Sequence, residues 1–147
     1  KKNTHSSVKV YTGQAGRKIM FEEKLKYKGE QYVLGAHLPS TQSRRFVDIY
    51  HHRRALQKIK LKMLFSQSEQ EAAKIFSKYQ LVQTRLLPKR NSSPIAINVY
   101  GEKVALLLGS ASLEPITIII EDAALAKEMI SYFKMLWAIS KPALRQK

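Results

Sequence analysis

The sequence IAINVYGEKVALLLGSASLEPITIIIE, residues 95–121, decides the fold. Two apolar runs flank Gly101 and Glu102, and a glycine there supplies the positive φ that a tight hairpin turn requires. The run that follows Pro115 is dominated by isoleucine, which is typical of a strand buried on both faces of a sheet. This stretch therefore predicts a hairpin followed by a buried strand.

Outward from this stretch, the pattern of apolar residues alternates between strand and helix. The expected strands are 8–11, 31–36, 60–65, 81–87, 95–100, 103–108 and 116–121. The expected helices are 14–28, 41–58, 68–79 and 122–139. Ser68 and Glu71 have the spacing of a capping box, and Asp122 is a good N-cap. This order predicts an α/β fold, a three-layer αβα sandwich with a mixed sheet.

Composition indicates one domain with an unusually basic surface. The 147 residues contain 26 Lys and Arg but only 11 Asp and Glu, a net charge of +15. Such a charge attracts polyanions, so direct contact with nucleic acid and a merely solvated basic surface both remain open. We expect residues 1–7 to be the remnant of a linker and residues 8–147 to form a single domain.

The chain has no cysteine, which excludes disulfides and favours a reducing compartment. It also contains no apolar run of the roughly 18–20 residues that span a bilayer, and its N-terminus lacks the apolar core of a signal peptide. We therefore expect a cytoplasmic protein without a membrane partner.

Residues that would carry chemistry are scarce. The sequence has no phosphate-binding glycine motif and no G-x-S-x-G elbow. Adjacent side chains such as His51 and His52 point about 100° apart on a helix, so they cannot chelate one ion. We expect no catalytic residues, no metal and no cofactor, and hence not an enzyme.

The basic helix offers the best candidate ligand residues. On a helical wheel, Arg53 lies at the centre of a face formed by Phe46, Ile49, Tyr50 and Leu56. A buried charge needs a partner, because burying it alone costs several kcal/mol. Arg53 is therefore either a structural arginine or one that faces an anionic or sugar ligand.

Six segments together resemble the effector region of TrmB-type transcriptional regulators. They are VKVYTGQAGRKIMFEEKL, FVDIYHHRRALQKIKLKMLF, RLLP, INVYGEKVALLL, ITIIIED and FKMLW, in that order. The resemblance implies a homodimer, an upstream winged-helix domain that binds DNA, and a small-molecule effector, possibly a sugar. On this reading the chain is the ligand-sensing and dimerisation domain of a transcriptional regulator, and Arg53, Arg54, Ser110 and Ser112 are its expected ligand-binding residues.

The same effector region is similar in fold to one half of a phospholipase D-like unit, whose active members carry an H-x-K-x-x-x-x-D motif. Aligned through the hairpin, the motif positions here hold Ser93, Ile95 and Tyr100. The resemblance thus implies the scaffold without its catalytic motif. A basic nucleic-acid-binding module is the alternative function, and a phospholipase D-type phosphodiesterase is a remote one.

Overall fold

The hairpin expected around Gly101 is present and belongs to a larger sheet. In the computed structural model, which describes residues 6–109 and 114–143, β5 (Ile95–Tyr100) pairs antiparallel with β6 (Lys103–Leu108). Gly101 has φ 56°, as the turn requires. The isoleucine-rich run forms β7 (Ile116–Glu121), which pairs antiparallel with β6.

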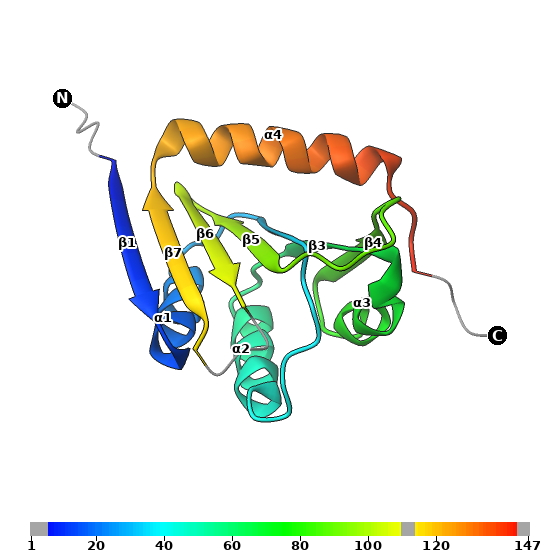
Figure 1. The fold of residues 1–147 in the computed structure, drawn as a ribbon, viewed down its shortest axis with the longest axis horizontal. Helices are drawn as coiled ribbons and strands as arrows, with labels where there is room; N and C mark the ends of the chain where they lie inside the picture. Colours follow the sequence, from blue (N-terminus) through cyan, green and yellow to red (C-terminus); the bar gives the residue numbers. More distant parts are fainter. Residues whose placement is uncertain (1–5, 110–113, 144–147) are drawn as a thin grey trace.

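The sheet has seven strands in the order β1-β7-β6-β5-β2-β3-β4 (Figure 1). The remaining strands are β1 (Ser7–Thr12), β2 (Gln31–Leu34), β3 (Leu61–Phe65) and β4 (Val82–Leu86). β2, β3 and β4 are parallel to one another, whereas β5, β6, β7 and β1 join antiparallel, so the sheet is mixed as expected.

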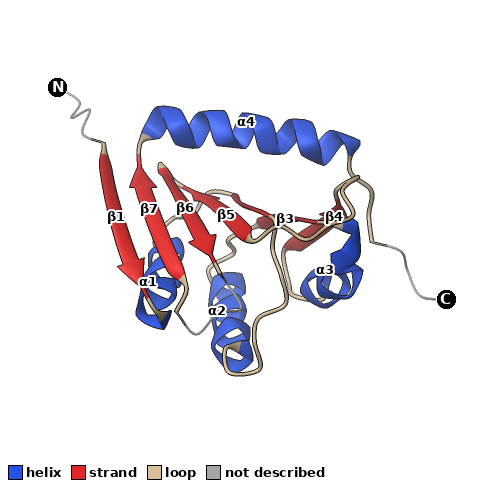
Figure 2. Cartoon of the chain, viewed as in Figure 1, coloured by secondary structure: helices blue, strands red, loops and turns tan. Residues whose placement is uncertain are grey.

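Helices cover both faces, which confirms the predicted three-layer α/β fold. One face carries α1 (Gln14–Lys24), α2 (Arg44–Leu56) and α3 (Gln70–Ser77), and the other carries α4 (Ala123–Ile139) (Figures 1 and 2). The core is divided accordingly. Val33 and Met63 of the sheet pack against Phe76 of α3 on one face, whereas Tyr32 packs against Phe133 of α4 on the other.

Of the two helix caps predicted from the sequence, one is present and one is not. Asp122 caps α4 as predicted, since its side chain accepts a hydrogen bond from the backbone of Leu125 at 2.8 Å. The capping box expected at Ser68 is wrong. A short 3-10 turn, η1 (Gln67–Glu69), precedes α3, and the Ser68 hydroxyl bonds other serines instead.

Two aromatic residues of α4, Phe133 and Trp137, pack against other side chains of the same chain. Phe133 stacks on Trp137 with ring centroids 5.7 Å apart and packs against Tyr32. Lys62 and Arg85 lie over the Trp137 ring. Other apolar residues of the same helix stay exposed, namely Tyr132, Met135 and Ile139. None of the described helices is long and apolar enough to cross a bilayer.

Candidate functional site

A crevice of about 370 Å³ opens where the parallel strands β2, β3 and β4 end. The carboxyl edge of parallel strands is where open α/β sheets hold their ligands. The crevice is lined by residues that follow these strands and by the start of β5: Leu34, Gly35, Ala36, His37, Ser66, Leu87, Pro88, Lys89, Asn91, Ser93, Ile95 and Ile97, with Leu136 of α4.

Gly35 brings β2 close to β5 at this edge. Its φ is +81°, which side chains rarely adopt, and a Cβ atom would stand 2.7 Å from the carbonyl oxygen of Ile95. The chain can therefore turn sharply after β2 only because position 35 is glycine. The turn delivers His37 to the crevice.

His37 is the centre of a polar network on the crevice wall. Its Nδ1 atom lies 3.2 Å from Glu69 Oε1, and its Nε2 atom contacts the carbonyl oxygen of Ser93. Glu69 also accepts a hydrogen bond from the Ser92 hydroxyl at 2.8 Å, and Ser92 in turn lies 3.1 Å from the Ser68 hydroxyl. The network joins the segment after β2, η1 and the loop between β4 and β5.

Both ring nitrogens of His37 face oxygen atoms. A neutral imidazole has one donor nitrogen and one acceptor nitrogen, so the tautomer decides which of the two oxygen atoms accepts a hydrogen bond from the ring. The sequence analysis missed this network, because its members are far apart in the chain. The available signal was a polar residue just after a predicted parallel strand.

The crevice borders an uncovered part of the sheet. Strand register places Val10, Ile118, Leu106, Ile97 and Leu34 in one row across five strands, on the same side as α4. The α4 helix covers only part of this side of the sheet. We call the apolar residues that stay half-buried or exposed on this side the apolar sheet face: Val8, Val10, Leu34, Ile95, Ile97, Leu106, Leu108, Ile116, Ile118 and Ile120.

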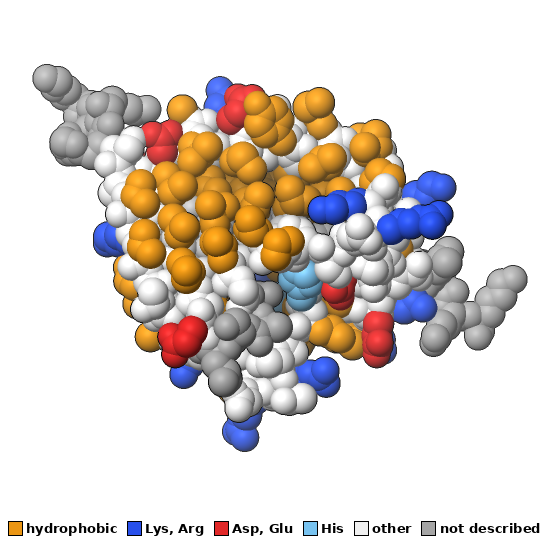
Figure 3. Space-filling model, viewed as in Figure 1, with side chains coloured by type: hydrophobic (Ala, Val, Ile, Leu, Met, Phe, Trp, Pro, Cys, Tyr) orange, Lys and Arg blue, Asp and Glu red, His pale blue; other side chains and the backbone are white. Residues whose placement is uncertain are grey.

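Every member of the apolar sheet face is half-buried or exposed, and Val8 and Val10 are 62% and 61% exposed. Figure 3 shows them as a broad hydrophobic area that no charged side chain interrupts. Contiguous apolar patches on a protein surface often mark interaction sites. Leu34, Ile95 and Ile97 belong to both the patch and the crevice.

The arginines proposed as ligand residues lie elsewhere, and the expected helical register was wrong. Arg53 is on the outer side of α2, 46% exposed, where it forms an ion pair with Glu22 at 2.6 Å. Its neighbour Arg54 is fully buried instead. Neither arginine lines the crevice.

Arg54 joins three elements. It donates hydrogen bonds to the carbonyl oxygens of Ile59 and Gln80, the latter at 2.6 Å, and to His51 Nδ1 at 3.2 Å. Those carbonyls precede the amino ends of β3 and β4, whereas the crevice lies at the carboxyl ends. Burial and the nearby Arg54 hold the pKa of His51 well below its usual value, which suits the neutral ring that accepts this bond.

Ser110 and Ser112, the other two expected ligand residues, lie outside the described residues. The three positions aligned with the phospholipase D motif lie within the described residues. Ser93 lies in the crevice wall, Ile95 belongs to the apolar sheet face, and Tyr100 is buried with its hydroxyl 3.0 Å from Glu23.

Comparison with known proteins identifies the fold. No protein-family model matches the sequence, and no curated protein matches it. Among solved structures, NucT from Helicobacter pylori has a TM-score of 0.75 at 9% identity, covering 94% of this chain and 99% of that protein. Nuc from Salmonella typhimurium, a phospholipase D family member, has a TM-score of 0.70 at 10% identity, covering 97% and 100%.

A DNA-binding protein has a similar fold. TrmBL2, an archaeal chromatin protein described as having a novel mode of DNA binding, has a TM-score of 0.61 at 16% identity. The match covers 92% of this chain and 54% of TrmBL2, so the chain corresponds to about half of that protein.

The expectation that the chain is not an enzyme has to be corrected. It rested on residues missing from one motif, but the same architecture occurs in Nuc, a member of the phospholipase D family of enzymes. At these identities the likeness shows the fold alone. This chain has a phospholipase D-like fold.

Proposed function

We propose that this chain is the effector-sensing and dimerisation domain of a DNA-binding transcriptional regulator, acting in the cytoplasm. The observation that carries the proposal is the apolar sheet face, which adjoins a ligand-sized crevice. Three further observations support the proposal: the crevice, the net charge of +15, and a fold similar to about half of TrmBL2.

A second copy of the chain is the partner that best fits the apolar sheet face. The face is continuous and carries no charged side chain, so its complement must also be apolar. A two-fold contact satisfies this requirement with one surface, because the same patch meets itself. The net charge of +15 makes two copies repel each other, so a dimer needs an uncharged contact surface such as this one.

The crevice is suited to a small effector. Its volume of about 370 Å³ falls within the range of about 300–1,000 Å³ typical of ligand pockets. Apolar walls and a few hydrogen-bonding groups, including His37, Ser66 and Asn91, fit a metabolite such as a sugar.

The position of the crevice couples the ligand to the dimer. Since Leu34, Ile95 and Ile97 line both surfaces, a ligand in the crevice would contact residues that also pack against the second copy. A ligand that binds one dimer arrangement better than another shifts the population toward it. The spacing of two attached DNA-binding domains would change with that shift.

Sedimentation equilibrium tests this function with a matched pair of variants. Val10→Lys puts a charge on the apolar sheet face, and Leu56→Lys puts the same charge on α2, where Leu56 is 72% exposed. We expect the wild type and Leu56→Lys to sediment as dimers and Val10→Lys as a monomer. A monomeric wild type, or a dimer that only Leu56→Lys dissociates, contradicts the proposal.

His37 favours a second candidate, phosphodiester hydrolysis on the phospholipase D-like scaffold. A carboxylate at Nδ1 orients an imidazole for nucleophilic or acid–base work at Nε2, and Glu69 holds this position. The loop that contains Ser93 would have to move, because its carbonyl oxygen occupies Nε2.

Hydrolysis of bis-p-nitrophenyl phosphate distinguishes this candidate. Turnover that His37→Asn abolishes and that His52→Asn, an exposed control on α2, leaves unchanged would support the phosphodiesterase. Turnover that neither variant alters would exclude His37 as its catalytic residue.

A further inference from the structure

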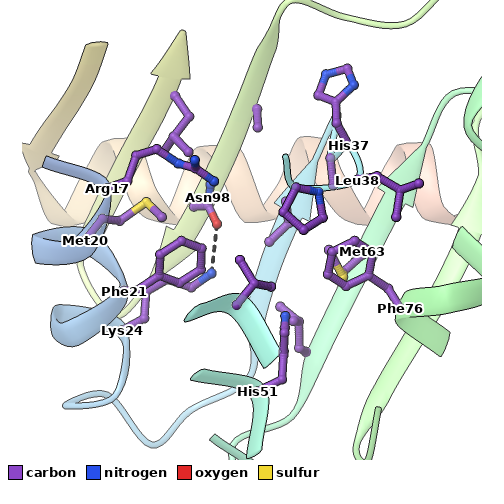
Figure 4. A pocket seen from close by; sticks show the side chains of 17 residues that line it. Arg17, Met20, Phe21, Lys24, His37, Leu38, His51, Met63, Phe76 and Asn98 are labelled. Carbon is purple, nitrogen blue, oxygen red and sulfur yellow. Dashed lines mark hydrogen bonds between the residues drawn. The ribbon is translucent and has the colours of Figure 1, made fainter. Parts of the chain in front are cut away.

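A second, smaller cavity lies behind the crevice wall, between α1, α2 and the sheet. Its volume is 70 Å³, and Ala36 and His37 line both it and the crevice. Figure 4 shows Arg17, Phe21 and Lys24 projecting from α1 toward this space. Its walls are mostly apolar: Met20, Phe21, Val33, Ala36, Leu38, Pro39, Val47, Leu61, Met63, Phe76, Ala96 and Leu107.

Two buried cations line this cavity. Lys24 and Arg17 are 2% and 7% exposed, and they lie two helical turns apart on the same face of α1. The Lys24 ammonium donates a hydrogen bond to Asn98 Oδ1 at 2.8 Å. Arg17 donates to Gln14 at 3.2 Å and to Ser43 at 3.3 Å, whereas its Nε–H, also buried, has no acceptor.

Within residues 6–109 and 114–143, no carboxylate balances these charges. The residues described as lining the cavity include no Asp or Glu, and the partners of both cations are neutral amides and a hydroxyl. Buried charges in proteins are normally paired, because an unpaired one costs several kcal/mol. A cavity with two unpaired cations is therefore arranged to receive an anion.

We infer that this cavity binds a small carboxylate anion, with its carboxylate toward Lys24 and Asn98 and its apolar end among the cavity's hydrophobic side chains. The inference goes beyond the proposed function, because it requires neither a second copy nor DNA. Ala36 and His37 line both spaces, so the crevice adjoins this site. The anion would enter the cavity from solvent through the crevice.

Size and wall chemistry select the carboxylate class. A cavity of about 150 Å³ holds the six carbon atoms of benzene, so by the same ratio a space of 70 Å³ accommodates about three non-hydrogen atoms, close to the size of acetate. Phosphate would leave several charged oxygens against apolar walls without donors, which is costly. A monocarboxylate instead presents one charged end and one apolar end.

Lys24 links binding to pH. Burial, and to a lesser extent Arg54, lowers the pKa of Lys24 to about 7. The groups that face it are the Phe21 ring on its own helix, Asn98 on β5, and the Tyr50 ring, His51 and Arg54 on α2. None of these supplies a negative charge at neutral pH, so a bound carboxylate raises the pKa of Lys24, and binding above pH 7 takes up a proton.

The test is calorimetric titration of the whole chain with sodium acetate at constant ionic strength, with sodium phosphate as the competing class. We expect carboxylates to bind at least tenfold more tightly at pH 6.5 than at pH 8.5, with proton uptake at the higher pH. Lys24→Met should abolish binding. Lys18→Met, an exposed control on the same helix, should leave binding unchanged.

A second measurement on the unmodified protein keeps the inference falsifiable if Lys24→Met fails to fold. In ¹³C NMR of the lysine side chains, one Cε signal should titrate near pH 7 and move to a higher pH in acetate. Either of two results overturns the inference: no lysine signal responds to carboxylates, or phosphate binds and carboxylates do not.

Discussion

Replacing Arg54 by Met is the sharpest test of how α2 is packed. The variant keeps most of the side-chain volume but removes three hydrogen bonds, leaving the carbonyl oxygens of Ile59 and Gln80 and His51 Nδ1 without this donor. Breaking a buried, charged network of this kind costs about 3–5 kcal/mol. With unfolding entropy of about 2.1 cal/mol/K per residue, 147 residues convert this loss into a drop in Tm of about 10–16 °C.

Differential scanning calorimetry measures the drop directly, and Arg53→Met is the matched control. Arg53 is half-exposed and its ion pair with Glu22 is in water, so we expect no resolvable change in Tm. If Arg53→Met lowers Tm as much as Arg54→Met, or if Arg54→Met leaves Tm unchanged, the assignment of Arg54 to the buried face of α2 is refuted.

Three further predictions concern stability and binding. Urea unfolding between pH 7 and 10 should show the free energy of unfolding rising with pH. In this range Lys24 is protonated in the unfolded chain but not in the folded chain, where its pKa is about 7. Lys24→Met should flatten the dependence of the unfolding free energy on pH. Stability should also fall as the pH drops below about 6.5, since the unfolded chain then protonates His51 and the folded chain does not; His51→Gln should weaken this acid limb. Fluorescence anisotropy with DNA duplexes should show weak binding that is indifferent to sequence and falls steeply with salt, and sequence-selective binding by the isolated chain at physiological salt would contradict this.

The strands could be predicted from the sequence because their signals are local. The isoleucine-rich run of β7 and the glycine of the β5–β6 turn need only their neighbours to be interpreted, and the strand and the turn are both present. The expectation that β7 is buried on both faces was wrong, because Ile116, Ile118 and Ile120 lie half-buried or exposed on one face. Helix boundaries were less accurate. The helix expected at 14–28 ends at Lys24. The spacing of apolar residues does not indicate where the last backbone hydrogen bonds of a helix form.

The buried face of α2 could not be obtained from polarity. The helical wheel relied on Ile49 and Leu56, which are 48% and 72% exposed, while His51 and Arg54 are buried. Arg54 is tolerated inside because carbonyl oxygens near the starts of β3 and β4 accept its hydrogen bonds. Only the fold brings those oxygens to the helix.

The candidate site was invisible for the same reason. His37, Glu69 and Ser92 meet across separations of 32 and 23 residues, with no motif to join them. The apolar sheet face follows from the alternation of each strand, but which of its residues α4 leaves uncovered depends on where that helix crosses the sheet.

Intermolecular contacts between methyl groups test the central claim most directly. In a sample mixed from isotope-labelled and unlabelled chains, isotope-filtered NOE spectra report only contacts between two copies. The account predicts intermolecular NOEs among the methyl groups of Val10, Leu108 and Ile118 on the apolar sheet face, and none from Leu56 on α2. An absence of intermolecular NOEs at millimolar protein concentration, or NOEs confined to α2, would contradict it.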